Sequence, residues 1–183
     1  MIQLAAFIAG SAALMWVSRA SLSSPKSHGF YRFFAWELIY ALFLLNVMVW
    51  FVHALAWYQL ISWVLLISSI PPLSLGIVGL TGKGKPADRR EGDETLLAFE
   101  QTTELVTTGI YRYIRHPLYS SLLILTWGIF FKDPSWAGGL LALAASLMLY
   151  ATARADEAEC IAFFGQPYQD YMKVSKRFIP HLF

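Results

Sequence analysis

The stretch LVTTGIYRYIRHPLY, residues 105–119, is polar, aromatic and basic, and it lies between long apolar runs. A proline disfavours helical conformation in the residue before it, so we expect a helix to begin at Pro117, with His116 just outside. The first turn of that helix would present unpaired N–H groups and the positive end of the helix dipole. The following residues, 118–131, are apolar. Ligand-capable groups at the mouth of a membrane helix indicate a functional site.

The composition is that of a membrane protein. Hydrophobic residues make up 57% of the 183 residues and charged residues only 14%, and the apolar residues fall in long runs. We predict one all-α polytopic membrane domain over residues 1–183. It has three spans within 1–80, and a connector, a helical hairpin and a C-terminal cytoplasmic amphipathic helix within 81–183. A net charge of +2 gives no indication of a nucleic-acid partner.

Five apolar runs are predicted to cross the membrane. They are residues 1–18, 33–52, 57–80, 118–131 and 136–153. Pro71 and Pro72 are expected to break or kink the third run. The fourth run would cover roughly 21 Å of a hydrocarbon core near 30 Å, so we expect His116 to lie below the level of the lipid headgroups.

Basic residues give the orientation. With five spans, 13 of the 14 lysine and arginine residues fall on one side of the membrane, and only Lys132 falls on the other. The positive-inside rule then places the N-terminus outside and the C-terminus in the cytoplasm. The chain is expected in the inner membrane if it is bacterial.

The polar segments carry further expectations. We predict a short helix over Asp93–Leu105 and a helix that continues past residue 153. In that helix Tyr150, Arg154 and Glu157 share one face with apolar residues, so Arg154 and Glu157 should point into the protein. Gly165–Pro167 should end the helix, and residues 168–180 should fold back against the membrane surface.

Two other features have ordinary interpretations. Residues 79–86, GLTGKGKP, nearly match a phosphate-binding loop, but Pro86 replaces the hydroxyl residue, and the segment follows a membrane helix. We interpret it as a cationic linker. Glu37 lies within the second predicted span, and the sequence leaves a structural position and a substrate-facing position equally open.

The motif of residues 105–119 has companions further along the chain. It is followed by RADEAECIAFFGQPYQDY at 154–171 and KRFIP at 176–180. Together these segments resemble the integral-membrane methyltransferases, which include isoprenylcysteine carboxyl methyltransferases, phospholipid methyltransferases and bacterial thiol methyltransferases. The resemblance covers roughly residues 103–180. It implies S-adenosylmethionine in a cytoplasm-facing pocket, and a lipid-like or small amphipathic acceptor that enters between helices.

The resemblance also implies positions for the site. Cofactor contacts carried over by position are Thr103, Glu104, Leu105, Val106, Tyr111, His116, Pro117, Leu118, Tyr119, Asp156 and Glu157. Asp156 or Glu157 would bind the amino-acid end of the cofactor.

The catalytic candidates are Arg154, Glu157 and His116. Arg154 would orient an anionic acceptor, since this chain has Thr152 where the isoprenylcysteine branch has a substrate arginine. Glu157 or His116 would be the base for an amine acceptor. No metal site is expected.

Two other functions compete with methyl transfer. Sterol reductases have a related C-terminal helical core but use NADPH, and the absence of an evident arginine cluster for a 2′-phosphate weighs against this hypothesis. A non-catalytic membrane scaffold is the other alternative. The acceptor itself is left open among a carboxylate, an amine and a thiol.

Overall fold

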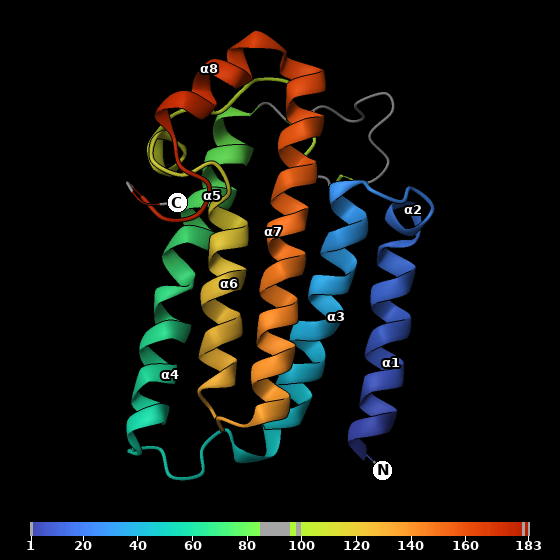
Figure 1. Cartoon of the computed structure of the whole chain (residues 1–183), viewed down its shortest axis with the longest axis vertical. Coiled ribbons are helices and arrows are strands. Elements are labelled where there is room, and N and C mark those ends of the chain that lie inside the picture. The colour runs from blue at the N-terminus through green and yellow to red at the C-terminus, as the bar shows by residue number, and fades with distance from the viewer. Residues whose placement is uncertain (1, 85–95, 98–99, 181, 183) are drawn as a thin grey trace.

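Long helices lie side by side, and one end of the bundle carries the C-terminal segment (Figure 1). The computed structural model describes residues 2–84, 96–97, 100–180 and 182, and these are all-α. The elements are α1 (Ile2–Val17), α2 (Arg19–Leu22), α3 (His28–Asn46), η1 (Val47–Val49), α4 (Trp57–Ser68), α5 (Ile70–Lys83), η2 (Gly109–Arg112), α6 (Pro117–Phe130), α7 (Trp136–Phe164) and α8 (Gln166–Val174).

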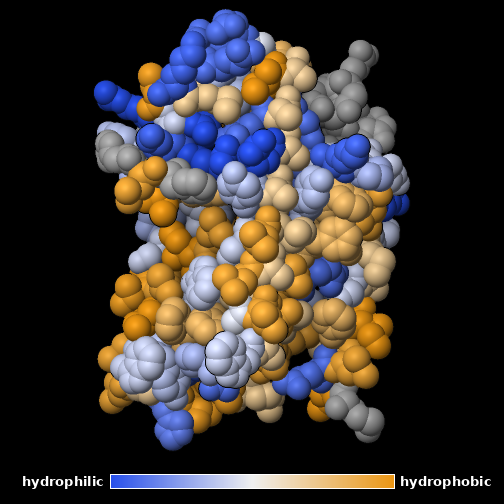
Figure 2. Space-filling model, viewed as in Figure 1, coloured by the Kyte–Doolittle hydropathy of each residue, from blue (hydrophilic) through white to orange (hydrophobic). Residues whose placement is uncertain are grey.

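Three helical stretches are long and apolar enough to cross a membrane. They are His28–Val49, Trp57–Lys83 and Trp136–Phe164, and the shorter apolar helices are Ile2–Val17 and Pro117–Phe130. Figure 2 shows hydrophobic residues over most of the visible face, and hydrophilic residues gathered mainly at the end that carries α8. The predicted all-α membrane architecture is therefore confirmed, while full crossing by the two shorter helices and the orientation remain predictions.

The predicted break in the third apolar run is present. α4 ends at Ser68 and α5 begins at Ile70, with Pro71 and Pro72 in its first turn. At this break the carbonyl of Ser69 accepts from the Ser121 hydroxyl of α6 at 2.7 Å. A side chain of a neighbouring helix thus contacts the backbone where the third run is interrupted.

One predicted boundary is wrong, and one predicted helix is not helical within the described residues. α3 begins at His28, five residues before the predicted span, because the Ser27 side chain caps it by accepting from the N–H of Phe30 at 3.1 Å. The helix predicted over residues 93–105 falls partly outside the described residues. Within 96–97 and 100–105 the chain is turn and extended, and the carbonyl of Gly84 accepts from the N–H groups of Thr103 and Glu104.

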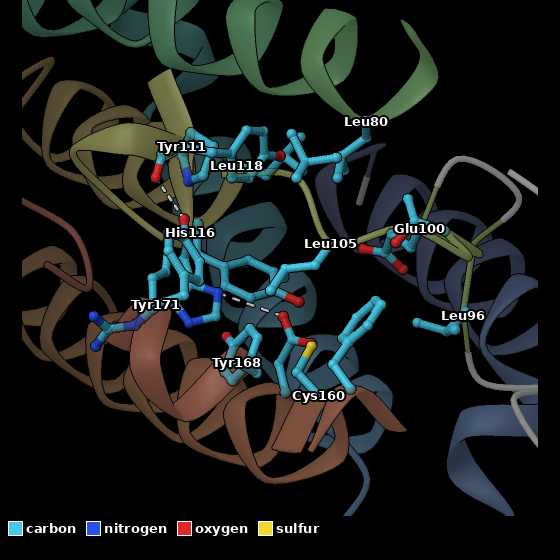
Figure 3. A pocket seen from close by; sticks show the side chains of 17 residues that line it. Leu80, Leu96, Glu100, Leu105, Tyr111, His116, Leu118, Cys160, Tyr168 and Tyr171 are labelled. Carbon is cyan, nitrogen blue, oxygen red and sulfur yellow. Dashed lines mark hydrogen bonds and ion pairs between the residues drawn. The ribbon is translucent and has the colours of Figure 1, made fainter. Parts of the chain in front are cut away.

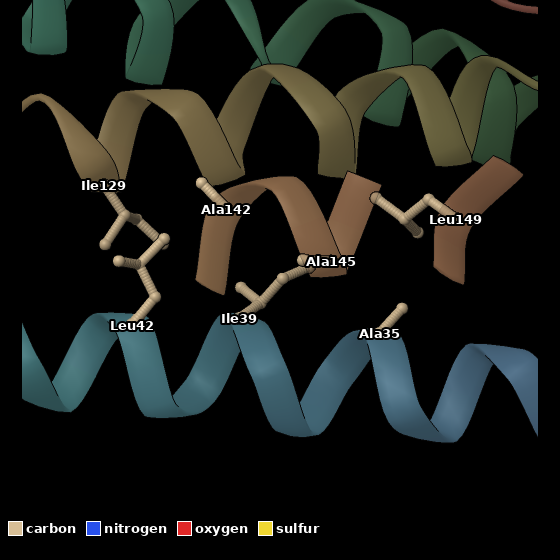
Figure 4. Packing of buried hydrophobic residues seen from close by; sticks show 7 residues of the cluster. All are labelled: Ala35, Ile39, Leu42, Ile129, Ala142, Ala145 and Leu149. Atoms are coloured by element: carbon tan, nitrogen blue, oxygen red, sulfur yellow. The ribbon is translucent and has the colours of Figure 1, made fainter. Parts of the chain in front are cut away.

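The core is the contact between α3 and α7. Small residues on both helices allow a close approach, and larger ones fill the ends of the contact, as Figure 4 shows. The buried cluster is Ala35, Ile39, Leu42, Ile129, Ala142, Ala145 and Leu149. This packing fixes α7, and therefore the acidic residues near its end, relative to α3.

A buried polar network closes the end of the bundle opposite α8. Lys132 is 1% exposed, and its ammonium lies 3.3 Å from the centre of the Trp63 ring. The ammonium donates to the Gln59 side chain at 3.1 Å, and the Gln59 amide donates to the carbonyl of Lys132 at 2.8 Å. The same amide donates to the carbonyls of Val49 and Val52 at 3.3 and 3.2 Å. Gln59 thus joins the connection between α3 and α4 to the connection between α6 and α7.

Replacing Gln59 with leucine should destabilise the protein. Gln59→Leu removes the acceptor of the Lys132 ammonium and the donor to three carbonyls, so we expect the free energy of unfolding to fall by about 2 kcal/mol. Denaturant unfolding of the purified protein in detergent micelles measures this change. The matched control is Gln3→Leu, which removes only an exposed bond to the carbonyl of Leu44. Equal stability of the two variants would contradict the prediction.

Candidate active site

The motif of residues 105–119 folds as predicted at its end. α6 begins at Pro117, with His116 as the residue before the first turn. Upstream, Gly109 adopts a φ of 65°, which glycine tolerates best, and it opens the short helix η2. The buried Tyr111 is held on two sides: its hydroxyl donates to the carbonyl of Gly76 at 3.2 Å, and its carbonyl accepts from the Tyr171 hydroxyl at 2.5 Å.

Glu157 is the centre of a buried ionic cluster. Arg115 donates to its Oε1 from Nε at 3.0 Å and from Nη2 at 2.9 Å. Arg177 donates to Oε1 from Nε at 3.0 Å and to Oε2 from Nη2 at 2.7 Å. His116 Nε2 lies 3.4 Å from Oε1, and Glu157 is only 3% exposed. The predicted convergence of the start of α6 with the end of the last long helix is therefore present.

The C-terminal segment packs on the motif. Arg115 N donates to the carbonyl of Lys176 at 2.7 Å, and Lys176 N donates to the carbonyl of Tyr113 at 2.9 Å. The Ser120 hydroxyl donates to the carbonyl of Phe178 at 2.9 Å. Residues 166–174 form α8, whose Tyr168 and Tyr171 are buried, and the residues that follow pair with the motif. Contact of this tail with the membrane surface stays a prediction.

A cavity opens beside His116, and Figure 3 shows the side chains that line it. Its walls come from the end of α5, from Leu96, Glu100 and Thr102, and from the motif, α7 and α8. The predicted cofactor residues that line it are Leu105, Val106, Tyr111, His116, Pro117, Leu118, Tyr119 and Asp156. The predicted residues that do not line it are Thr103, Glu104, Arg154 and Glu157.

Asp156 is the acidic residue that α7 presents to the cavity. Its Oδ2 lies 3.4 Å from His116 Nδ1, and its Oδ1 accepts from the Cys160 thiol at 3.5 Å. Cys160 is partly exposed and lines the cavity. His116 therefore bridges Asp156 on the cavity side and Glu157 on the cluster side.

This bridge keeps His116 charged. Burial lowers the pKa of the imidazole, but hydrogen bonds to Asp156 and Glu157 outweigh it, so the pKa of His116 is raised above 6.5. An imidazolium that donates from both ring nitrogens has no lone pair to take a proton. The ring also stacks on Tyr119, with centroids 5.4 Å apart and planes 21° apart. His116 is thus a positioning group for the two carboxylates.

Arg154 does not point into the protein as predicted. It is exposed and hydrogen-bonds with the Tyr150 side chain, on the outer side of α7. The buried face runs through Leu149, Ala153 and Glu157, at spacings of four residues. The small Ala153 gave no signal of burial beside the larger Arg154, so the prediction was off by one residue at this turn, while Glu157 is buried as predicted.

Residues 92–172 match the phospholipid methyltransferase family. The chain is also 33% identical over 79 residues to methanethiol S-methyltransferase 2 of Bradyrhizobium diazoefficiens. Those residues are 42% of this chain and 29% of that protein, so the chain spans less than a third of this relative's length. No solved structure matches the chain significantly. The resemblance predicted from the motif is confirmed, and the matched family is one of methyltransferase enzymes.

Several site residues escaped the sequence analysis. In the segment that matches the family, Arg115 lines the cavity, and its position directly before His116 was an available signal. Glu100 also lines the cavity and pairs with Arg32 of α3 at 2.5 Å. No spacing pattern connects Arg32 with Glu100, because 68 residues separate them.

The raised pKa of His116 predicts a pH dependence of stability. The folded state binds the proton more tightly than the unfolded state, so the stabilisation is full below pH 6.5 and is lost as the pH rises through the folded-state pKa. We expect His116→Gln to cost the most stability near about pH 6 and progressively less toward about pH 10. Thermal unfolding across this range, with the exposed His53→Gln as control, measures it. A cost of His116→Gln that does not change with pH would contradict the bridge.

Proposed function

We propose that the protein transfers a methyl group from S-adenosylmethionine to a small amphipathic acceptor at the membrane. The observation that carries this proposal is the cavity in which Asp156, the His116–Tyr119 stack and the first turn of α6 face one another. The match of residues 92–172 to a methyltransferase family supports the same reaction class.

The residues present fit this cofactor. Asp156 offers a half-buried carboxylate for the ammonium of the cofactor's amino-acid end. The N–H groups of Leu118 and Tyr119 belong to the first turn of α6, which suits the cofactor's carboxylate. The Tyr119 ring suits a sulfonium, a contact that contributes about 0.5–2 kcal/mol. The cavity has an empty volume of about 710 Å³, part of it open to solvent, which lies within the size range of small-molecule sites.

When bound, S-adenosylmethionine supplies an electrophilic methyl group whose bond to sulfur breaks, with its electron pair, as the acceptor's lone pair bonds to carbon. The protein then needs to align the two reactants and exclude water. Buried walls of Val106, Tyr111 and Tyr119 serve the second requirement.

The two predicted bases favour an acceptor that needs no proton removed within the site. His116 bridges two carboxylates, and Glu157 accepts from two arginines, so neither is free to take a proton. Arg115 lines the cavity, but its guanidinium already donates to Glu157 and to the carbonyl of Ser175. We therefore propose a thiolate or carboxylate acceptor, and the name of the methanethiol methyltransferase relative favours the thiolate.

Asp156→Asn should weaken S-adenosylmethionine binding about 10-fold to 100-fold, because it removes the charged partner of the ammonium. Isothermal titration of the full chain in detergent measures the dissociation constant. Asp170→Asn is the matched control, since Asp170 lies on α8 with its side chain 58% exposed and pairs with Lys173. Unchanged binding by Asp156→Asn would remove Asp156 from the site.

Parallel titration with NADPH separates methyl transfer from the reductase alternative. Glu100 and Asp156 both face the cavity, and two carboxylates oppose a 2′-phosphate. We expect S-adenosylmethionine to bind and NADPH not to bind. Binding of NADPH alone would favour the reductase, and binding of neither would favour the scaffold.

A further inference from the structure

Glu100 places a second carboxylate on the wall of the cavity. Its Oε2 accepts from Arg32 Nη1 at 2.5 Å and from the N–H of Leu97 at 2.9 Å. Its Oε1 has no hydrogen-bond partner among the residues that the structure describes, and it is not sealed off from solvent. The side chain is 12% exposed and lines the cavity. One oxygen is thus fixed, and the other remains available to a ligand.

Residues of α3 hold Glu100 in this orientation. Arg32 of α3 is 4% exposed and lies over the ring of Trp36 at 5.1 Å. His28, at the start of α3, lies 3.9 Å from Glu100 Oε2 through its Nε2 and is fixed by Glu159, 2.5 Å from its Nδ1. α3 lies outside the segment that matches the methyltransferase family. The N-terminal half of the chain thus shapes this wall of the site.

The surroundings of Glu100 decide what kind of group it can bind. Burial raises the pKa of this carboxyl, but the nearby His28 and the charge and hydrogen bond of Arg32 outweigh it and hold the pKa below 4.5, so Glu100 is ionised. Its charge is already balanced by Arg32, and a second cation would gain little there. A neutral donor such as a hydroxyl gains a charge-assisted hydrogen bond from the available oxygen.

We propose that Glu100 is a cofactor-binding residue whose Oε1 accepts hydrogen bonds from the ribose hydroxyls of S-adenosylmethionine. This inference rests on the proposed function. It complements Asp156: the two carboxylates line the same cavity, one for the amino-acid end of the cofactor and one for its sugar. The helix α3, through Arg32, then acts as a positioning element for the cofactor.

The first test changes the ligand and leaves the protein intact. Isothermal titration of the full chain compares S-adenosylhomocysteine with its 2′,3′-dideoxyribosyl analogue. We expect the analogue to bind about 10-fold to 100-fold more weakly, because Glu100 loses its donors. Equal affinity for the two ligands would overturn the inference while leaving the proposed function standing. Failure of the intact chain to bind S-adenosylhomocysteine would overturn the proposed function itself.

The second test changes the residue. In Glu100→Gln the amide oxygen is expected to remain with Arg32 and Leu97 N–H, so the amide nitrogen faces the cavity and cannot accept a hydrogen bond. We expect the affinity difference between the two ligands to disappear in this variant and to persist in the control Asp170→Asn. A difference that persists in folded Glu100→Gln would assign the ribose to another residue.

Discussion

The ionic cluster around Glu157 is the interaction on which the site depends. One buried carboxylate accepts four hydrogen bonds from two arginines and lies beside an imidazolium. A buried charge is tolerable only when its partners are all present, and loss of one partner is strongly destabilising. Because Arg115 precedes α6 and Arg177 follows α8, the cluster joins three segments that are distant in the sequence.

The neighbouring residues Asp156 and Glu157 have different roles. Successive residues of a helix point about 100° apart, so one side chain can face the cavity while the other faces the cluster. His116 connects the two through its ring nitrogens. The charges that hold the C-terminal segment in place thus also set the orientation of the acid that lines the cavity.

Local sequence signals predicted the backbone well. Proline chemistry placed the start of α6 and the break between α4 and α5, and glycine at 165 ended α7 with a φ of 65°. The choice between adjacent helix faces was harder. Arg154 and Ala153 differ by one position, and periodicity alone could not decide which of them faces the protein.

No signal in the sequence indicated the partners of Glu100. Arg32 and His28 precede the predicted span 33–52 in the sequence, and the packing of α3 against α7 brings them to the cavity wall. Likewise, the near phosphate-binding loop at 79–86 is helical through Lys83, which agrees with its rejection as a nucleotide site; Lys85 and Pro86 lie outside the described residues. Tertiary contacts decide whether such residues reach a site, and a single sequence does not show these contacts.

The most direct test of this account is an experimental structure of the full chain with bound S-adenosylhomocysteine. The account predicts that the amino-acid end of the ligand lies between Asp156 and the first turn of α6, while Arg115 and Arg177 still hold Glu157. A ligand that contacts Glu157 directly after displacing both arginines, or that binds at the opposite end of the bundle, would contradict it.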